Sequence, residues 1–142
     1  MQSVTRAVLT AGVGAVLTLS ATASAGAEVS GLDVESGTLQ SRGLVANVPV
    51  TFACDEGAQY DLSLSVMQVV QQKTVTGGGT YTFGTCTGET QTVSMQVRPG
   101  PKPFKKGPAL ADASISTYCD DPEFGYVFCG SASVESDEMR LR

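Results

Sequence analysis

Residues 60–66, Tyr60-Asp61-Leu62-Ser63-Leu64-Ser65-Val66, alternate strictly between apolar and polar side chains. Successive side chains of a β-strand point to opposite faces, so this period of two indicates a strand with one buried face. The pattern continues towards Val70 and recurs in Val48–Cys54, Val93–Val97 and Ala109–Cys119. Because no stretch after the first 25 residues shows a convincing helical period, the chain is predicted to be all-β.

Shorter segments complete the predicted strands. They are an edge strand within Leu32–Leu39, a strand at Lys73–Thr76, a strand at Thr80–Cys86, and a last strand made of Tyr126–Val134 and Met139–Leu141 with a bulge or break near Asp137. The glycines at residues 77–79 predict a turn or an edge bulge after Thr76, because glycine adds no packing to a strand.

Two segments are predicted to lie outside the strands. Arg98–Pro108 contains four prolines and is expected to be a crossover loop excluded from the sheet ladders, since proline has no N–H to donate. Asp120–Gly125 is expected to be a polar loop. About seven short strands with regular turns favour an antiparallel immunoglobulin-like β-sandwich. A small Greek-key barrel is the alternative.

The first 25 residues predict a signal peptide. Arg6 precedes an apolar run from Ala7 to Leu19, and Ala23-Ser24-Ala25 has the small side chains that signal peptidase accepts. The apolar run is shorter than the about 20 residues that span a membrane. Cleavage is expected after Ala25, with Ala27 as the second choice. The predicted organisation is a signal peptide at 1–25 and one secreted domain at 26–142, without a membrane anchor.

The composition excludes several functions. The formal net charge is −5, and −6 without Arg6, so phosphate backbones are repelled and nucleic acid is not an expected partner. The chain has no histidine, which removes Ser-His-Asp and Cys-His catalysis. We therefore expect no enzymatic activity, no catalytic residue, no cofactor and no metal.

Four cysteines remain in the mature chain. An even number in an exported protein predicts two disulfides. A tetrathiolate zinc site is the alternative, but such sites bring their ligands in close pairs that this chain lacks. The preferred pairing is Cys54–Cys86 with Cys119–Cys129, because a hairpin brings the last two together. The rival pairing, Cys54–Cys119, would imitate the inter-sheet bridge of antibody domains without their tryptophan.

Several short motifs occur in order along the mature chain. They are Val50–Cys54, Gly84–Gly88 with its Cys-Thr-Gly sequence, Pro103–Gly107 followed by Ala109, and the close pair Cys119 and Cys129. With these motifs the chain resembles a group of small secreted proteins from actinobacteria. The resemblance implies an immunoglobulin-like fold and an extracellular location, and it implies no particular activity.

Two sets of side chains are candidates for a binding surface. Aromatic residues are concentrated around the last predicted hairpin, where they could recognise a partner or cap the core: Tyr118, Phe124, Tyr126 and Phe128. Lys102, Lys105 and Lys106 form the main basic cluster, which could engage an anionic polymer or a protein. The alternative for the lysines is a solvated loop whose Phe104 plugs the end of the sandwich.

Two further segments have weaker functional interpretations. Asp120, Asp121 and Glu123 could bind calcium, although their spacing matches no EF-hand loop, and a solvated loop tip is the favoured interpretation. Gly77–Phe83 could accept another chain by strand addition, and an ordinary hairpin is the alternative.

The sequence thus predicts a monomeric, non-enzymatic interaction module whose partner is a protein or a component of the cell surface. Two alternatives share its format of about 110 residues with two disulfides. One is a carrier of a small apolar ligand, as in the neocarzinostatin type of apoprotein. The other is a secreted protease inhibitor that presents a rigid loop.

Overall fold

The computed structural model describes residues 28–142, and the predicted signal peptide at residues 1–25 lies outside them. Within this range the chain forms strands and one short 3-10 helix, and no helix there is long and apolar enough to cross a membrane. The elements are β1 Ser30–Val34, β2 Thr38–Gln40, η1 Ser41–Gly43, β3 Val45–Ala53, β4 Gln59–Val70, β5 Lys73–Thr85, β6 Gln91–Val97, β7 Gly107–Asp121 and β8 Gly125–Leu141.

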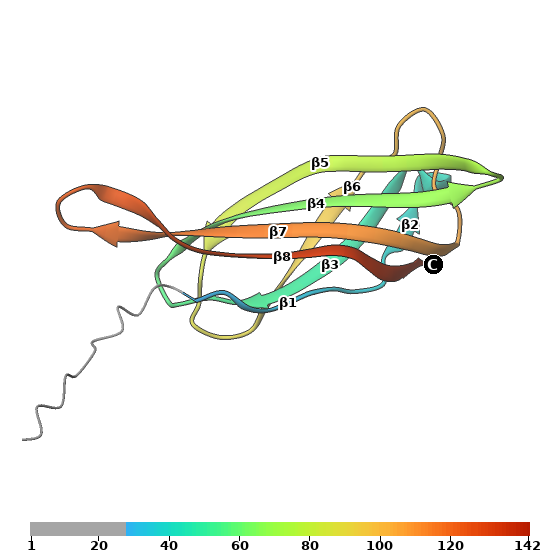
Figure 1. The fold of residues 1–142 in the computed structure, drawn as a ribbon. Coiled ribbons are helices and arrows are strands. Elements are labelled where there is room, and N and C mark those ends of the chain that lie inside the picture. The colour runs from blue at the N-terminus through green and yellow to red at the C-terminus, as the bar shows by residue number, and fades with distance from the viewer. Residues whose placement is uncertain (1–27) are drawn as a thin grey trace, which may run out of the picture.

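The strands form two packed sheets, and all their neighbouring pairs are antiparallel. In the first sheet β3 pairs with β1, β2 and β6, and the second sheet has the order β5-β4-β7-β8. Figure 1 shows the two sheets packed together, with the four long strands of the second sheet side by side. With β3 and β6 in one sheet and β4, β7 and β8 in the other, the topology is that of an immunoglobulin-like sandwich. The predicted fold class is confirmed.

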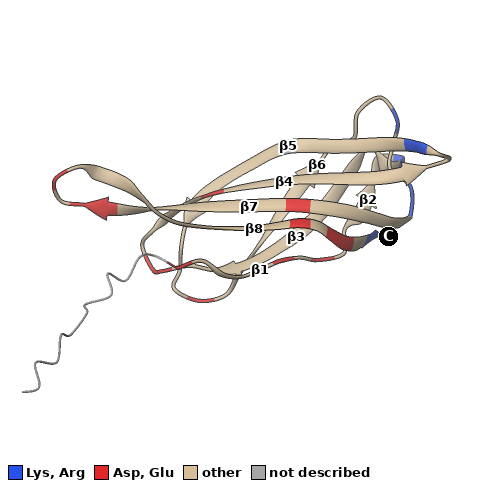
Figure 2. Ribbon diagram, viewed as in Figure 1, with Lys and Arg blue, Asp and Glu red and all other residues tan. Residues whose placement is uncertain are grey.

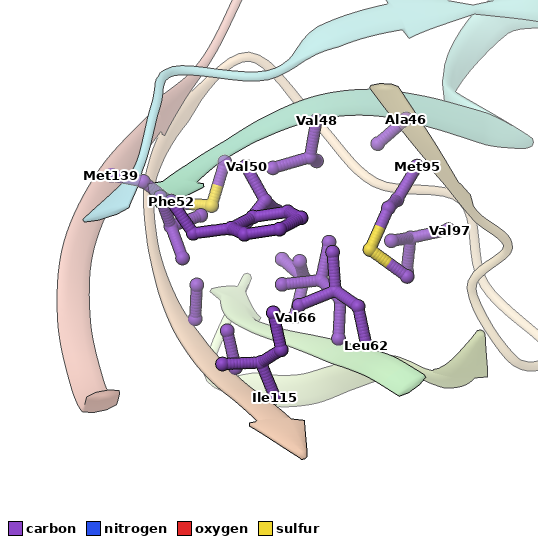
Figure 3. Packing of buried hydrophobic residues seen from close by; sticks show 14 of the residues in the cluster. Ala46, Val48, Val50, Phe52, Leu62, Val66, Met95, Val97, Ile115 and Met139 are labelled. Carbon is purple, nitrogen blue, oxygen red and sulfur yellow. The ribbon is translucent and has the colours of Figure 1, made fainter. Parts of the chain in front are cut away.

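The core lies between the sheets and is built from alternate residues of each strand. Figure 3 shows apolar side chains of the two sheets meeting there. Phe52 and Tyr60 pack edge to face with their ring centroids 4.9 Å apart. Burial raises the pKa of Tyr60, and a hydrogen bond with Gln91 offsets part of this increase. The fully buried side chains include Val48, Val50 and Phe52 of β3, Leu62, Leu64 and Val66 of β4, Met95 and Val97 of β6, and Ile115 of β7.

Isolated bridges join the two sheets at one end of the sandwich. Gly37 pairs with Leu141 at the end of β8, and Gly77 of β5 pairs with Pro99 just after β6. Backbone hydrogen bonds accompany both bridges, among them Gly37 N–H to Arg140 O at 2.9 Å. The sheets therefore meet at this end as they would in a barrel, while the two-sheet order of a sandwich holds along the strands.

The predicted exclusion of Arg98–Pro108 from the sheets is wrong at two prolines. Pro99 forms the bridge with Gly77, and Pro108 is the second residue of β7, opposite Arg140. Proline is tolerated near a strand end, where its missing N–H breaks no central ladder and its carbonyl still accepts a hydrogen bond. The residues between these two prolines form the predicted crossover from β6 to β7.

The glycines at 77–79 make a bulge but do not divide β5. The strand is continuous, and its register with β4 shifts between Leu64 and Val66, opposite the glycines. The predicted bulge is confirmed and the predicted break is wrong. A Cβ on Gly77 would lie 2.8 Å from the Phe104 ring and 2.7 Å from the Arg98 carbonyl oxygen. Glycine at this position therefore lets the crossover segment pack directly against β5.

The β7–β8 hairpin is longer than the sequence predicted. Its strands have 15 and 17 residues, so the polar loop expected at Asp120–Gly125 is reduced to a turn at residues 122–124. In Figure 1 the hairpin extends beyond the ends of β4 and β5. The irregularity predicted near Asp137 is confirmed, because the register with β7 shifts between Val134 and Asp137, and Ser136 has a φ of 52°.

Both disulfides have the preferred pairing. Cys54–Cys86 has a Cα–Cα distance of 5.5 Å and Cys119–Cys129 one of 5.8 Å, and no cysteine of the described chain is free. The zinc alternative and the Cys54–Cys119 pairing are therefore both wrong. The first bridge connects the end of β3 to the end of β5 and so links the two sheets. The second connects β7 to β8 inside the extended hairpin.

Candidate functional site

The aromatic residues fall into a buried group and an exposed group. Phe52, Tyr60 and Phe104 are buried in the core. The other six of the nine aromatic residues are partly or largely exposed on β5, β7, β8 and the turn between the last two: Tyr81, Phe83, Tyr118, Phe124, Tyr126 and Phe128. The alternative that the hairpin aromatics cap the core is wrong, since Phe124 is 73% exposed and Phe128 is 62% exposed.

The strand register places most of these exposed rings on one face. On β5, Tyr81 lies opposite Ser63 of β4, and Phe83 lies opposite Asp61. The residues adjacent to Ser63 and Asp61 in β4 point into the core, so Ser63 and Asp61 themselves point outward. On the other side of β4, Tyr118 of β7 lies opposite Phe128 of β8, with ring centroids 6.2 Å apart in an edge-to-face arrangement. The outer surface of the β5-β4-β7-β8 sheet therefore carries these two pairs of rings with a strip between them. We call this surface the aromatic face.

The middle of the aromatic face is polar. The hydroxyls of Ser63 and Ser114 are 2.7 Å apart and share a hydrogen bond. A shallow depression of about 290 Å³ lies here, and its lining includes Tyr81, Asp112 and Glu135. Within the described chain, Asp61 Oδ1 is a covered side-chain oxygen without a hydrogen-bond partner. The serines of the face are Ser63 and Ser65 on β4, Ser114 and Ser116 on β7, and Ser131 and Ser133 on β8.

The tip of the β7–β8 hairpin is a defined turn. Asp121 Oδ1 accepts hydrogen bonds from the backbone N–H groups of Glu123 at 2.9 Å and Phe124 at 3.0 Å. Asp121 therefore stabilises the turn, and the exposed Phe124 is held at its end. Across residues 28–142, no group of three or more acidic, cysteine or histidine side chains is arranged to hold a metal ion. The structure thus gives the calcium interpretation of this loop no support.

A second depression of about 520 Å³ lies on the same sheet near its opposite end. Met67, Val69 and Leu110 contribute apolar side chains to its lining, and Glu138 and Arg140 border it. Val69 is 71% exposed. This depression is open to solvent, although its lining also includes the buried residues Gln68, Ala109 and Met139. It therefore differs from the enclosed apolar pocket that a carrier of a small ligand would need.

The segment that carries Lys102, Lys105 and Lys106 is firmly anchored. Phe104 is 1% exposed and its N–H donates to Gly43 O at 2.9 Å, so the interpretation of Phe104 as a plug for the end of the sandwich is confirmed. Gly43 has a φ of 88°, and a Cβ there would overlap with the Phe104 carbonyl oxygen. The three lysines are exposed around this plug.

All eight basic residues of the described chain lie at this end of the molecule. The N-terminal ends of β3, β5 and β7 and the C-terminal ends of β4, β6 and β8 meet here. Figure 2 shows the basic residues gathered at this end, whereas acidic residues are spread over the hairpin tip, β7, β8 and other parts of the chain. We call it the basic end, and its cations are Arg42, Lys73, Arg98, Lys102, Lys105, Lys106, Arg140 and Arg142.

Part of the Gly77–Phe83 edge, the candidate for strand addition, is already occupied. Gly77 pairs with Pro99, Gly100 N–H donates to Thr76 O at 3.0 Å, and Thr80 Oγ1 donates to Gln96 O at 2.8 Å. Because these bonds use the first half of the segment, an added strand would find its free backbone groups beyond Thr80.

Comparisons of this chain with protein-family models, curated proteins and solved structures find no match. Its function must therefore be inferred from its own surface.

Sequence reasoning found the hairpin aromatics and the lysines but missed half of the aromatic face. The alternation within the predicted strand Thr80–Cys86 puts Tyr81 and Phe83 on one side of it but does not show which side is buried. Their exposure follows from the pairing with Ser63 and Asp61. The structure also separates the two predicted sets, because Phe124 lies at the acidic hairpin tip and the lysines lie at the opposite end.

Proposed function

We propose that this protein is a secreted, non-enzymatic binding protein whose recognition surface is the aromatic face, extended by the hairpin tip. The observation that carries the proposal is the concentration of exposed aromatic side chains on one sheet and its hairpin. Soluble proteins rarely leave large apolar side chains grouped on their surface unless a partner covers them. Aromatic rings are also enriched in recognition surfaces, because they offer large contact area at low entropic cost.

Secretion is part of the same proposal. The N-terminal pattern ending at Ala25 is that of a cleavable signal peptide. Two disulfides are compatible with an oxidising, extracellular compartment. The short motifs around Cys54, Cys86 and Phe104 support a place among small secreted actinobacterial proteins.

The experiment is a binding assay with the exported protein on envelopes of the organism that produces it. The labelled wild-type protein is expected to bind saturably. Phe83→Ser and Phe128→Ser should each weaken binding, because both remove an exposed ring. Leu44→Ser is the matched control, since Leu44 is 57% exposed but lies at the basic end.

Circular dichroism must first show that the variants remain folded, which we expect because the three side chains are exposed. Absence of saturable binding, or equal binding by all three variants and the wild type, would contradict the proposed function.

A second candidate function is favoured by the basic end. Eight exposed cations at one end of an acidic protein create a local positive potential, which attracts polyanions despite the net charge. The anchored Phe104 plug holds the central lysines in place, which lowers the entropic cost of binding. We propose contact with an anionic polymer of the cell surface as this second function.

A further inference from the structure

We propose that the ligand of the aromatic face is a neutral glycan whose chain crosses the strands of the β5-β4-β7-β8 sheet. This inference rests on the proposed function and names the chemical class of its partner. Three properties of the aromatic face favour such a ligand: its shape, the chemistry of its middle strip and its charge.

The aromatic face has the dimensions of a short oligosaccharide. Neighbouring strands are spaced by about 5 Å, so Phe83 on β5 and Tyr118 on β7, with β4 between them, are separated by about 10 Å across the sheet. Phe128 on β8 adds one further strand spacing. The rings therefore border a strip wide enough for more than one linked pyranose ring.

The exposed rings suit the apolar side of a sugar. One side of a pyranose ring presents mainly C–H groups, whose partial positive charge is attracted by the negative face of an aromatic ring. Tyr81 is 63% exposed and Phe83 is 75% exposed, so sugar rings can reach them without unfolding any strand. Stacking on preformed strands requires little reorganisation, which favours affinity.

The strip between the rings suits the hydroxyl groups of the same sugar. Its serine side chains both donate and accept hydrogen bonds, and its carboxylates accept them. Ser114, Ser133 and Asp112 line the depression of about 290 Å³ directly beside Tyr81. Asp61 lies in the row between Phe83 and Ser116, so its carboxylate adds acceptor chemistry to this strip.

Two other partner classes fit this surface less well. Protein interfaces have a dehydrated apolar centre, whereas here the aromatic side chains stand at the margins and serines occupy the middle. Anionic polymers would be repelled by Asp61, Asp112 and Glu135 on or beside the face. A neutral glycan needs no dehydrated apolar centre and carries no charge that these carboxylates would repel.

The test divides the envelope of the producing organism by chemistry. Envelopes are digested with a broad protease, and the released polysaccharide is separated by anion exchange into a neutral flow-through and a retained charged fraction. Binding of the wild-type protein to each fraction is measured by affinity electrophoresis. We expect retardation by the neutral fraction, with little change between low and high salt, because no charge pairs form.

Variants connect the binding to the aromatic face. Phe83→Ser should weaken binding to the neutral fraction about tenfold, on the scale of other aromatic stacking contacts. Phe83→Tyr should restore it, since a tyrosine keeps the stacking ring. Leu44→Ser, remote from the face, should bind like the wild type.

The outcomes separate this inference from the proposed function. If envelopes bind the protein but only the charged fraction or a protease-sensitive component is responsible, the neutral-glycan inference is wrong. The proposed function then stands if Phe83→Ser weakens that binding, and it is wrong if Phe83→Ser binds like the wild type. If Phe83→Ser and Leu44→Ser bind the neutral fraction equally, the glycan does not use the aromatic face and the inference is also wrong. If the envelopes do not bind the protein, both the neutral-glycan inference and the proposed function are wrong.

Discussion

Gln68 is the residue whose side chain does most to order the basic end. It is 3% exposed, and its amide donates to Lys105 O at 2.7 Å and to Pro108 O at 3.2 Å. Its Oε1 accepts the Lys105 N–H at 2.9 Å. One buried side chain therefore satisfies three backbone groups of the crossover segment, which a loop of this kind cannot satisfy by sheet pairing.

Replacing this amide should be costly. We predict that Gln68→Leu lowers the free energy of unfolding by about 2 kcal/mol, because it leaves one N–H and two carbonyl groups without their partner. Urea denaturation followed by circular dichroism gives the value. Gln96→Leu is the matched control, since Gln96 is exposed on β6, and its effect should stay within about 0.5 kcal/mol. Equal losses in the two variants would show that the Gln68 hydrogen bonds contribute nothing.

At the scale of elements, the two disulfides hold different parts of the fold. Cys54 and Cys86 are buried and connect strands of opposite sheets. Cys119 and Cys129 are only partly buried and lie in the hairpin that extends beyond the sandwich. The first bridge should therefore stabilise the whole domain, whereas the second should mainly stabilise the hairpin that carries Phe124, Tyr126 and Phe128.

Removing each bridge tests this difference. Replacing Cys54 and Cys86 together by alanine should lower the global free energy of unfolding by up to about 4 kcal/mol, from the entropy of the unfolded chain. The same change at Cys119 and Cys129 should cost less than about 3 kcal/mol and should increase amide exchange chiefly in the hairpin. Hydrogen exchange with mass spectrometry distinguishes the two patterns. Exchange that increases uniformly over the domain in the second variant would refute the local role.

On the scale of the whole molecule, the basic residues are gathered at one end of the strands, whereas the acidic residues are distributed along them. The Lys and Arg residues of the described chain occupy one end, although acidic residues outnumber basic ones. Because the strands run the length of the sandwich, residues distant in sequence, such as Arg42, Lys105 and Arg142, meet at the same end. The molecule therefore presents a positive surface far from its aromatic hairpin tip.

This segregation should be measurable on a polyanion. At low salt the protein should bind heparin–agarose in spite of its negative net charge. The double variant Lys102→Gln with Lys105→Gln should elute at a clearly lower salt concentration than the wild type. Thr90→Glu with Ser94→Glu changes the net charge equally at two exposed positions, one directly before β6 and one in the middle of β6. The control pair should elute close to the wild type. If both pairs shift elution equally, net charge governs binding and the basic end has no separate role.

The sequence by itself determined the fold class, most strand positions and the identity of the hairpin aromatics, and it favoured the observed disulfide pairing over its rival. These depend on local patterns: the period-two alternation of Tyr60–Val66 follows from strand geometry, and Cys119 and Cys129 are close enough in sequence to meet across a hairpin. The same reasoning located Phe104 as a plug, because it is the aromatic residue of an otherwise proline- and lysine-rich crossover.

Only the tertiary structure decided which side chains share a surface. Alternation shows that Tyr81 and Phe83 lie on the same side of a strand, but the neighbouring strand and its register decide whether that side faces the core or water. The bridges of Gly37 and Gly77, the hydrogen bonds of Gln68 and the gathering of cations at one end join residues distant in sequence. Such contacts depend on how the two sheets pack, which no local pattern contains.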